Sequence, residues 1–168
     1  MLSGESANGQ FPVNAVRMLA NTALEAESCL DYKALYKAIH SSVMAKGPVG
    51  VSEAIAASAV ESAEDVNASV IVALTQTGYT ARLLAKFKPR QMIIAVSSCP
   101  ITCAQTTTLR GVIPVLADDF KDTEALIAKG VAAAKARGFA STGDAVVAVH
   151  GVKEEGAGNT SLMKIVVA

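Results

Sequence analysis

Five short apolar runs constrain the fold of this chain more than any other feature of its sequence. The run at 70–74 reads Val-Ile-Val-Ala-Leu, which is too short for a helix and is rich in β-branched residues. Runs of this kind are typical of strands that are buried on both faces of a sheet. The predicted strands are 70–74, 92–96, 112–116, 145–149 and 162–167.

Helical segments are predicted between the first four of these strands, at 80–87, 101–109 and 123–136, the last of them ending at Gly138. Alternating strands and helices predict a parallel sheet with helices on both of its faces. The last connection, 151–160, has no helical pattern, so the final two strands are predicted to pair as an antiparallel hairpin. The predicted fold class is therefore α/β, with a mostly parallel sheet of about five strands.

Three more helices are predicted ahead of the first strand. Apolar residues recur at helical spacing over 12–28, where a proline suits the first helical position. A second helix is predicted to follow Asp31 as its N-cap and to run to about Met44, and a third follows Ser52 as its N-cap and covers 53–66. The polar residues at 1–9 are interpreted as a loop.

The composition excludes several classes of function. The 168 residues are 51% hydrophobic but only 4% aromatic, which predicts an aliphatic core between helices and sheet. Lys plus Arg and Asp plus Glu number 15 each, so no net basic field attracts nucleic acid or an anionic membrane. No run reaches the ~20 apolar residues of a membrane span, and we expect no secretory signal. Cys29, Cys99 and Cys103 are interpreted as reduced thiols, so we expect a cytoplasmic protein.

The segment that follows the first predicted strand is the strongest candidate for a binding site. Three threonines and a glycine lie there, directly before a helix begins. Backbone N–H groups at a helix start, with hydroxyls beside them, suit a phosphate group. An ordinary helix start with Thr77 as N-cap explains the same pattern, and the residues alone leave both open. The candidate residues are Thr75, Gln76, Thr77, Gly78, Tyr79 and Thr80.

The connection 151–160 is the second candidate. It is long for a hairpin loop, and its three glycines allow a close approach to a ligand, although a plain surface loop is the alternative interpretation. It follows the fourth strand, so it lies at the same edge as the threonine turn if the first and fourth strands are parallel. Its candidate ligand contacts are Lys153, Gly156 and Asn159.

Other polar residues are interpreted structurally. Cys99 and Cys103 lack metal or redox spacing and are interpreted as packed thiols, and His40 and His150 as structural residues. Asp119 or Asp122 is predicted to cap a helix. The chain shows no nucleophile–base pair, no metal-spaced acidic motif and no phosphate-binding Walker loop, so no catalytic or metal-binding residue is assigned.

Several blocks of this sequence occur in the same order in one enzyme family. They are Met1 to Gly9, Phe11-Pro12, 15–18, 53–61, Thr75 to Arg82, Lys86 to Pro89, Arg110 to Val115 and Gly143-Asp144. Together they cover essentially the whole chain, which on these blocks resembles pyruvate kinase. Ser6 stands where the family usually has threonine.

The resemblance implies two parts. Residues 1–28 would be the end of the last strand and the following helix of a catalytic (β/α)₈ barrel, and 29–168 a complete carboxy-terminal domain. Because Met1 falls inside a family motif, we expect a truncated piece of a longer protein. The family's enzyme transfers phosphate from phosphoenolpyruvate to ADP with Mg²⁺ and K⁺, using residues from earlier barrel strands, so the chain alone is expected to be inactive and to hold no cofactor.

The resemblance also implies an allosteric site, where the threonine turn grips a sugar phosphate and the loop 151–160 closes over it. Gln76 stands where activator-binding relatives often have Lys, and Tyr79 where they often have Arg. Lys153 is followed by two glutamates, and the Trp and Arg that grip a second phosphate have no counterpart between 116 and 132. The expected effector is therefore a sugar monophosphate.

The family's tetramer uses the carboxy-terminal domain at one interface, which implies self-association here. The apolar strand 162–167 is expected to lie at a sheet edge, where unpaired strands associate readily. Leu162, Lys164 and Val166 are the predicted interface residues. The alternative interpretation is a stand-alone ligand-sensing or scaffold module that reuses this domain.

Overall fold

The computed structural model describes residues 2–151 and 160–168 and divides the chain into two compact units, Met1–Asp31 and Tyr32–Ala168. The boundary falls three residues after the predicted one. No helix in the described part of the chain combines the length and the apolar character that crossing a membrane requires.

The first unit consists of two helices, α1 (Gly4–Ala7) and α2 (Pro12–Ser28). Helix α2 has the predicted bounds, with its proline in the first turn. Helix α1 corrects the loop predicted at 1–9, because the Ser3 carbonyl accepts the Ala7 N–H at 3.0 Å and closes one helical turn. No residue of α2 is buried: Val13, Val16 and Leu24 are 65%, 52% and 66% exposed. The helix therefore presents apolar side chains to solvent.

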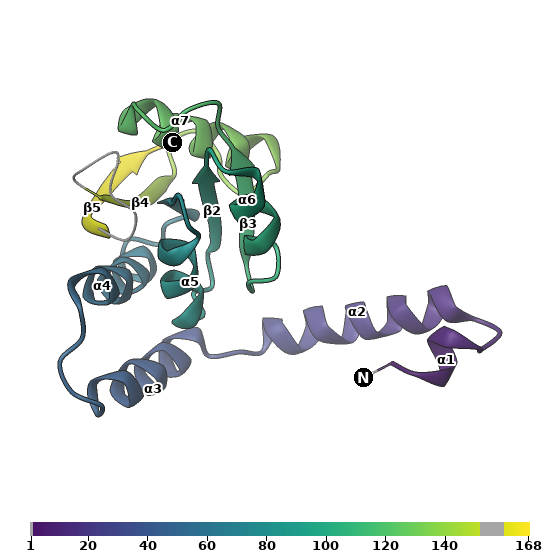
Figure 1. Ribbon diagram of the computed structural model, residues 1–168. Helices are drawn as coiled ribbons and strands as arrows, with labels where there is room; N and C mark the ends of the chain where they lie inside the picture. Colours follow the sequence, from purple (N-terminus) through teal and green to yellow (C-terminus); the bar gives the residue numbers. More distant parts are fainter. Residues whose placement is uncertain (1, 152–159) are drawn as a thin grey trace. The chain divides into compact units, whose positions relative to one another are not determined.

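The second unit is built on a five-stranded sheet with the order β3-β2-β1-β4-β5 (Figure 1). The first four strands pair in parallel, and β5 pairs antiparallel to β4, as the sequence predicts. The strands are β1 (Val70–Leu74), β2 (Met92–Ser97), β3 (Val112–Leu116), β4 (Ala145–Gly151) and β5 (Thr160–Val167).

Helices cover both faces of the sheet. Each face has its own hydrophobic core. On one face, alternate strand residues pack against α4 and α5, and on the other face the remaining strand residues pack against α7. Fully buried parallel strands need apolar residues on both faces, which is why the runs were recognisable in the sequence. The helices are α3 (Tyr32–Met44), α4 (Val51–Asp65), α5 (Tyr79–Lys86), α6 (Pro100–Thr106) and α7 (Thr123–Ala136).

Helices α4 and α6 differ most from the predicted bounds. Helix α4 begins one residue before Ser52, because Gly50 is its N-cap in an extended conformation and its carbonyl accepts the Glu53 N–H at 3.1 Å. Helix α6 ends at Thr106 rather than at 109, where Thr107 and Thr108 turn their hydroxyls onto preceding backbone carbonyls. Hydroxyl side chains compete with helical hydrogen bonds in this way.

Helix α7 lies very close to the sheet. A Cβ on Gly130 would lie 2.7 Å from Val72 Cγ1 and 3.1 Å from Val96 Cγ2, so only glycine fits without movement. The Asp122 side chain caps α7 by accepting the N–H groups of Glu124 and Ala125 at 3.0 and 3.1 Å. One of the two predicted caps is thereby confirmed.

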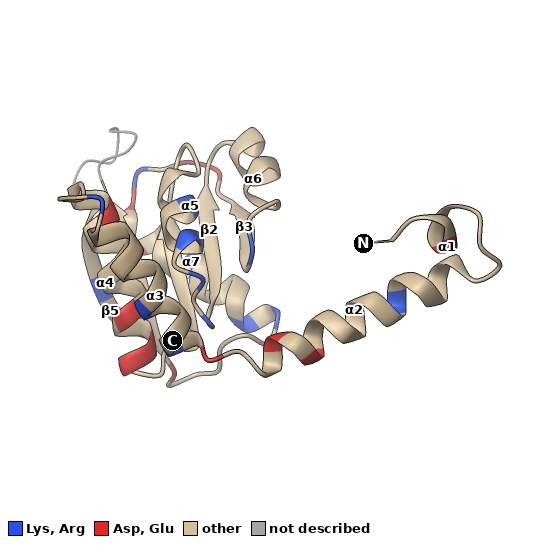
Figure 2. Cartoon of the chain, turned by 90° about the horizontal axis from the view of Figure 1, so that it is seen from below, with Lys and Arg blue, Asp and Glu red and all other residues tan. Residues whose placement is uncertain are grey.

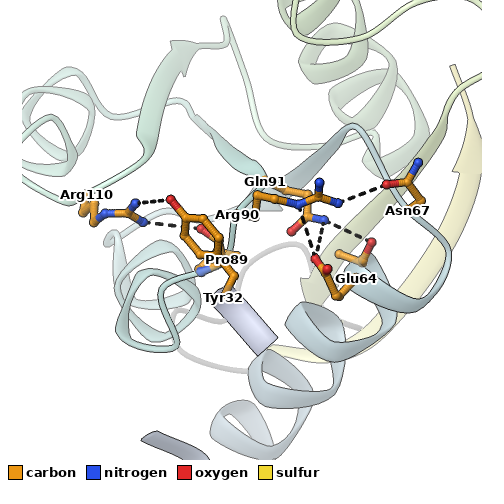
Figure 3. A network of polar contacts seen from close by, with 8 residues as sticks. Tyr32, Glu64, Asn67, Pro89, Arg90, Gln91 and Arg110 are labelled. Atoms are coloured by element: carbon orange, nitrogen blue, oxygen red, sulfur yellow. Dashed lines mark hydrogen bonds and ion pairs between the residues drawn. The ribbon is translucent and has the colours of Figure 1, made fainter. Parts of the chain in front are cut away.

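Ion pairs join separate elements of this unit: Lys86 of α5 pairs with Glu53 of α4, and Lys164 of β5 pairs with Glu124 of α7. The charged side chains of helix α3 are all basic, and those of α4 are all acidic (Figure 2). At the start of α3, Arg110 donates to the Tyr32 hydroxyl at 3.0 Å and to the Pro89 carbonyl at 3.4 Å (Figure 3). These contacts tie the start of α3 to the loops that precede β2 and β3.

Candidate effector site

The threonine turn lies at the carboxyl ends of the parallel strands, between β1 and α5. From β1 the chain crosses toward β2, whereas from β4 it turns to the opposite side, toward β5. The space outside β1 and β4 is therefore the topological switch point of the sheet, the usual place for ligands in open α/β folds.

Only part of the predicted turn faces solvent. Thr75 and Gly78 are buried, and the Thr75 N–H donates to the Val96 carbonyl at 3.0 Å. Gln76 is half-buried, whereas Thr77 and Tyr79 are exposed. The turn therefore offers a ligand the Thr77 hydroxyl, the Tyr79 ring and the backbone donors at the start of α5.

The N-cap of α5 is Gly78, with φ 79°, which corrects the alternative of Thr77 as the cap. A left-handed backbone favours glycine, and an added Cβ would lie 3.1 Å from the Thr106 methyl. Within residues 2–151 and 160–168, no side chain caps the first turn of α5. Helix α7 differs, because the Asp122 carboxylate already occupies two of its N–H groups.

Helix α6 supports the turn from behind. The Thr102 hydroxyl donates to the Gln76 carbonyl at 2.7 Å, and the methyl groups of Thr102 and Thr106 surround the position of a Cβ on Gly78. Both threonines are buried. Sequence reasoning missed them, although polar residues four apart on a helix that follows a buried strand are a usable signal for an inward polar face.

The turn meets the beginning of β5. The hydroxyls of Thr80 and Thr160 lie 2.6 Å apart and are buried. The connections after β1 and β4 therefore meet at one edge of the sheet, as the parallel pairing of these strands requires. The predicted contacts Lys153, Gly156 and Asn159 lie outside the described residues.

Strand β5 forms one edge of the sheet, as expected, and β3 forms the other. Of the predicted interface residues, Leu162 is 42% exposed, Lys164 pairs with Glu124 of α7 at 2.7 Å, and Val166 packs against the α7 cluster. Ile165 and Val167, which were not predicted, are more exposed, at 48% and 75%. They alternate with the predicted residues along the strand and so lie on its other face.

His150 and the three cysteines are the remaining polar candidates. His150 Nδ1 lies 3.0 Å from the Gly151 carbonyl oxygen. The three cysteines are free thiols, with Cys29 exposed and Cys99 and Cys103 half-buried. In the described part of the chain, no three His, Cys, Asp or Glu side chains are grouped so as to hold a metal ion.

A small hollow lies at the opposite end of the sheet, between α3, α4 and the loop before β2. Its polar groups bind one another: Arg90 lies 3.5 Å from Glu64, and Gln91 donates to the Ala63 carbonyl at 3.2 Å (Figure 3). The Tyr36 hydroxyl donates to the Ala57 carbonyl at 3.1 Å. These pairings are those of packed secondary structure rather than of a ligand site.

Comparison with known proteins identifies the family. Residues 53–166 match the family model described as pyruvate kinase, alpha/beta domain. A pyruvate kinase of Eimeria tenella is 47% identical over 167 residues, 99% of this chain. The chain belongs to the pyruvate kinase family. A pyruvate kinase of Dictyostelium discoideum is 38% identical over 98% of the chain.

Solved pyruvate kinases share the fold. A structure of pyruvate kinase from Cryptosporidium parvum superposes with a TM-score of 0.89 at 47% identity, over 99% of this chain and 32% of that one. Another from the same organism, in complex with ADP, gives 0.86 at 46% identity, over 99% of this chain and 33% of that one. The chain spans about a third of the pyruvate kinases it matches: 31% of the Eimeria protein and 33% of the Dictyostelium one.

Proposed function

We propose that this chain is the effector-binding and assembly region of a cytoplasmic pyruvate kinase, a glycolytic transferase. The whole enzyme would transfer a phosphoryl group from phosphoenolpyruvate to ADP with Mg²⁺ and K⁺. The described residues offer no grouped ligands for a divalent metal, so no step of that reaction is assigned to them. Phosphoryl transfer requires positioned metal and cationic groups. The chain alone should therefore form no pyruvate from phosphoenolpyruvate and ADP, and turnover by the pure chain would contradict this assignment.

The start of α5 carries the effector proposal. Its first-turn N–H groups are uncapped by described side chains, the exposed Thr77 hydroxyl lies beside them, and Thr102 fixes the preceding carbonyl. A helix start of this kind attracts a phosphate through oriented donors and the helix dipole. Thr80 would act indirectly, because its hydroxyl holds Thr160 and so the end of the loop that would close over the ligand.

The charge of the turn supports a monophosphate. None of the six residues Thr75-Gln76-Thr77-Gly78-Tyr79-Thr80 is charged, and Glu154 and Glu155 follow Lys153 in the loop. A second phosphate would need cations of its own to offset its desolvation. The proposed ligand is a hexose 6-phosphate, with Tyr79, Gly156 and Asn159 toward the sugar.

Calorimetry on the chain tests this choice. Glucose 6-phosphate should bind more tightly than fructose 1,6-bisphosphate, and inorganic phosphate should bind more weakly than either. Thr77→Val and Thr80→Ala should both weaken binding of the hexose phosphate. Thr108→Val is the matched control, because Thr108 is exposed and lies beyond the end of α6. Tighter binding of the bisphosphate, or unchanged binding in Thr77→Val, would overturn the proposed site.

The two edges of the sheet differ in their capacity for assembly. The Ile93 N–H donates to the Gly111 carbonyl at 2.7 Å, and the Ala117 N–H donates to the Ser97 carbonyl at 2.8 Å. The backbone N–H and C=O groups of odd-numbered residues in β3 therefore point toward β2. Because hydrogen-bonding direction alternates along a strand, the Pro114 nitrogen faces outward and offers no donor there. Edge prolines discourage strand pairing. Strand β5 has no proline, so we propose that it pairs with β5 of a second copy.

Sedimentation velocity over a range of concentrations tests the assembly proposal. The parent chain should form a dimer, which the whole enzyme would build into a tetramer. Leu162→Lys should dissociate it, whereas Leu116→Lys, at the exposed end of β3, should not. A parent chain that stays monomeric at high concentration would count against pairing through β5.

A further inference from the structure

Two thiols lie beside the effector turn, on the helix that supports it. Cys99 is the N-cap of α6, and the Cys103 N–H donates to the Cys99 carbonyl at 3.1 Å, which closes the first helical turn. Residues four apart on a helix share a face. Both thiols are free and half-buried, and the Cys103 sulfur lies 4.0 Å from the Ser97 carbonyl oxygen. This places a pair of thiols within one turn of helix.

The surroundings of the two thiols shift their pKa values in opposite directions. The backbone N–H of Thr102, and then that of Ile101, lower the pKa of Cys99 below its ordinary value. Burial, and then the charge of Cys99, raise the pKa of Cys103. The thiolate is the form that attacks an oxidant. Cys99 is thus suited to react first and Cys103 to resolve the product.

The residue between them connects the pair to the effector turn. Thr102 lies inside the Cys99–Cys103 turn, and its single hydroxyl proton is donated to the Gln76 carbonyl at 2.7 Å. Helical residues four apart hold their Cβ atoms about 5–6 Å apart, whereas a disulfide requires roughly 3.5–4.5 Å. Bridging the two sulfurs therefore draws in the first turn of α6 and moves Thr102 with it.

We propose that Cys99 and Cys103 form a reversible disulfide that weakens the effector turn. The Cys99 thiolate attacks hydrogen peroxide, the O–O bond breaks, and a sulfenic acid and, after protonation, water result. The Cys103 thiol then displaces the second water as the S–S bond forms. Two thiols and one peroxide thus give one disulfide and two waters. Strained disulfides are readily reduced, so excess thiol reverses the step through exchange.

The first test needs no effector. The Cys29→Ser chain, which removes the exposed third thiol, is treated with peroxide and titrated for free thiols. We expect loss of both remaining thiols, a Cys99–Cys103 crosslink in the peptide map and faster amide exchange over 75–80, all reversed by dithiothreitol. The matched variant, Cys29→Ser with Cys103→Ser, should form only a trappable sulfenic acid. Thiols that survive while Cys29 of the parent is oxidised, or a disulfide with unchanged exchange over 75–80, would overturn the proposal.

The second test rests on the proposed function. The oxidised Cys29→Ser chain should bind glucose 6-phosphate about tenfold more weakly than the reduced one, the loss expected for one well-placed hydrogen bond. Unchanged affinity would overturn the coupling to the site. Failure of both forms to bind would instead refute the effector proposal. The amide-exchange measurement would still test whether the disulfide weakens the effector turn.

Discussion

Replacing Gly130 with alanine is a direct test of how α7 packs on the sheet. Alanine is more favourable than glycine in a helix interior by about 1 kcal/mol. The new Cβ, however, would lie 2.7 Å from Val72 Cγ1 and 3.1 Å from Val96 Cγ2. Valine has one strongly preferred rotamer and cannot move aside easily, and overpacking costs about 1–3 kcal/mol. Taking the middle of that range, about 2 kcal/mol, less the gain in helix propensity, we expect Gly130→Ala to lower the free energy of unfolding by about 1 kcal/mol.

A second background makes the test decisive. Val72→Ala removes both methyl groups of Val72, which lie 2.7 and 3.3 Å from the new Cβ. In that background Gly130→Ala should raise the stability, by about 0.5–1 kcal/mol, because the helix propensity remains and most of the clash is gone. Ala132→Gly, at an exposed position of α7, measures the propensity alone and should give the same loss in both backgrounds.

Urea unfolding followed by far-ultraviolet circular dichroism supplies the measurement, since the chain contains no Trp. The reasoning is refuted if Gly130→Ala matches or exceeds the parent in stability. It is equally refuted if the loss is as large with alanine at position 72.

Two further predictions concern polar side chains that are buried or half-buried. Thr80→Val or Thr160→Val alone should lower the free energy of unfolding by about 1–3 kcal/mol, because each leaves a buried hydroxyl unpaired. The double variant should lose less than the sum of the two single losses. Strictly additive losses in thermal unfolding would contradict the pairing of the two hydroxyls. Burial, and then Glu61, raise the pKa of Tyr36 from 10.0 to about 12, so the neutral phenol is favoured in the folded state. The resulting stabilisation should be complete below pH 10.0 and disappear as the pH rises toward 12. Tyr36→Phe should remove the phenolate absorbance step near 12, and an unchanged titration would contradict this assignment.

The sheet was largely predictable from the sequence because each central strand is buried on both faces and therefore admits only apolar residues. Strand β5 starts earlier than predicted, at Thr160, because its first two residues are polar and give no apolar signal. The turn after β1 was found because its threonines and glycine are local in sequence. The hydrogen bonds that hold the turn in place could not be found in this way, because they join residues far apart in the sequence. The bond from Thr102 to Gln76 spans 26 residues, and the bond from Thr80 to Thr160 spans 80.

Capping explains the other differences. Ser52 has the side chain of a good N-cap, yet the backbone conformation of Gly50 starts α4 earlier, and tertiary packing decides between such close alternatives. Gly78 likewise takes the place of Thr77, because the left-handed backbone allows α5 to begin against α6. The sequence does not determine which residue begins a helix when two neighbouring residues can both act as its N-cap.

The position of β1 in the centre of the sheet has a consequence for synthesis on the ribosome. Val70 pairs with Met92 of β2 on one side and with Val146 of β4 on the other. Strand β2 therefore emerges soon after β1, whereas the partner in β4 lies 76 residues after Val70 in the chain. Pairings that are distant in sequence slow folding. Until β4 has been made, the most apolar strand of the nascent chain has one edge open. During that interval the open edge of β1 is available for pairing with other chains.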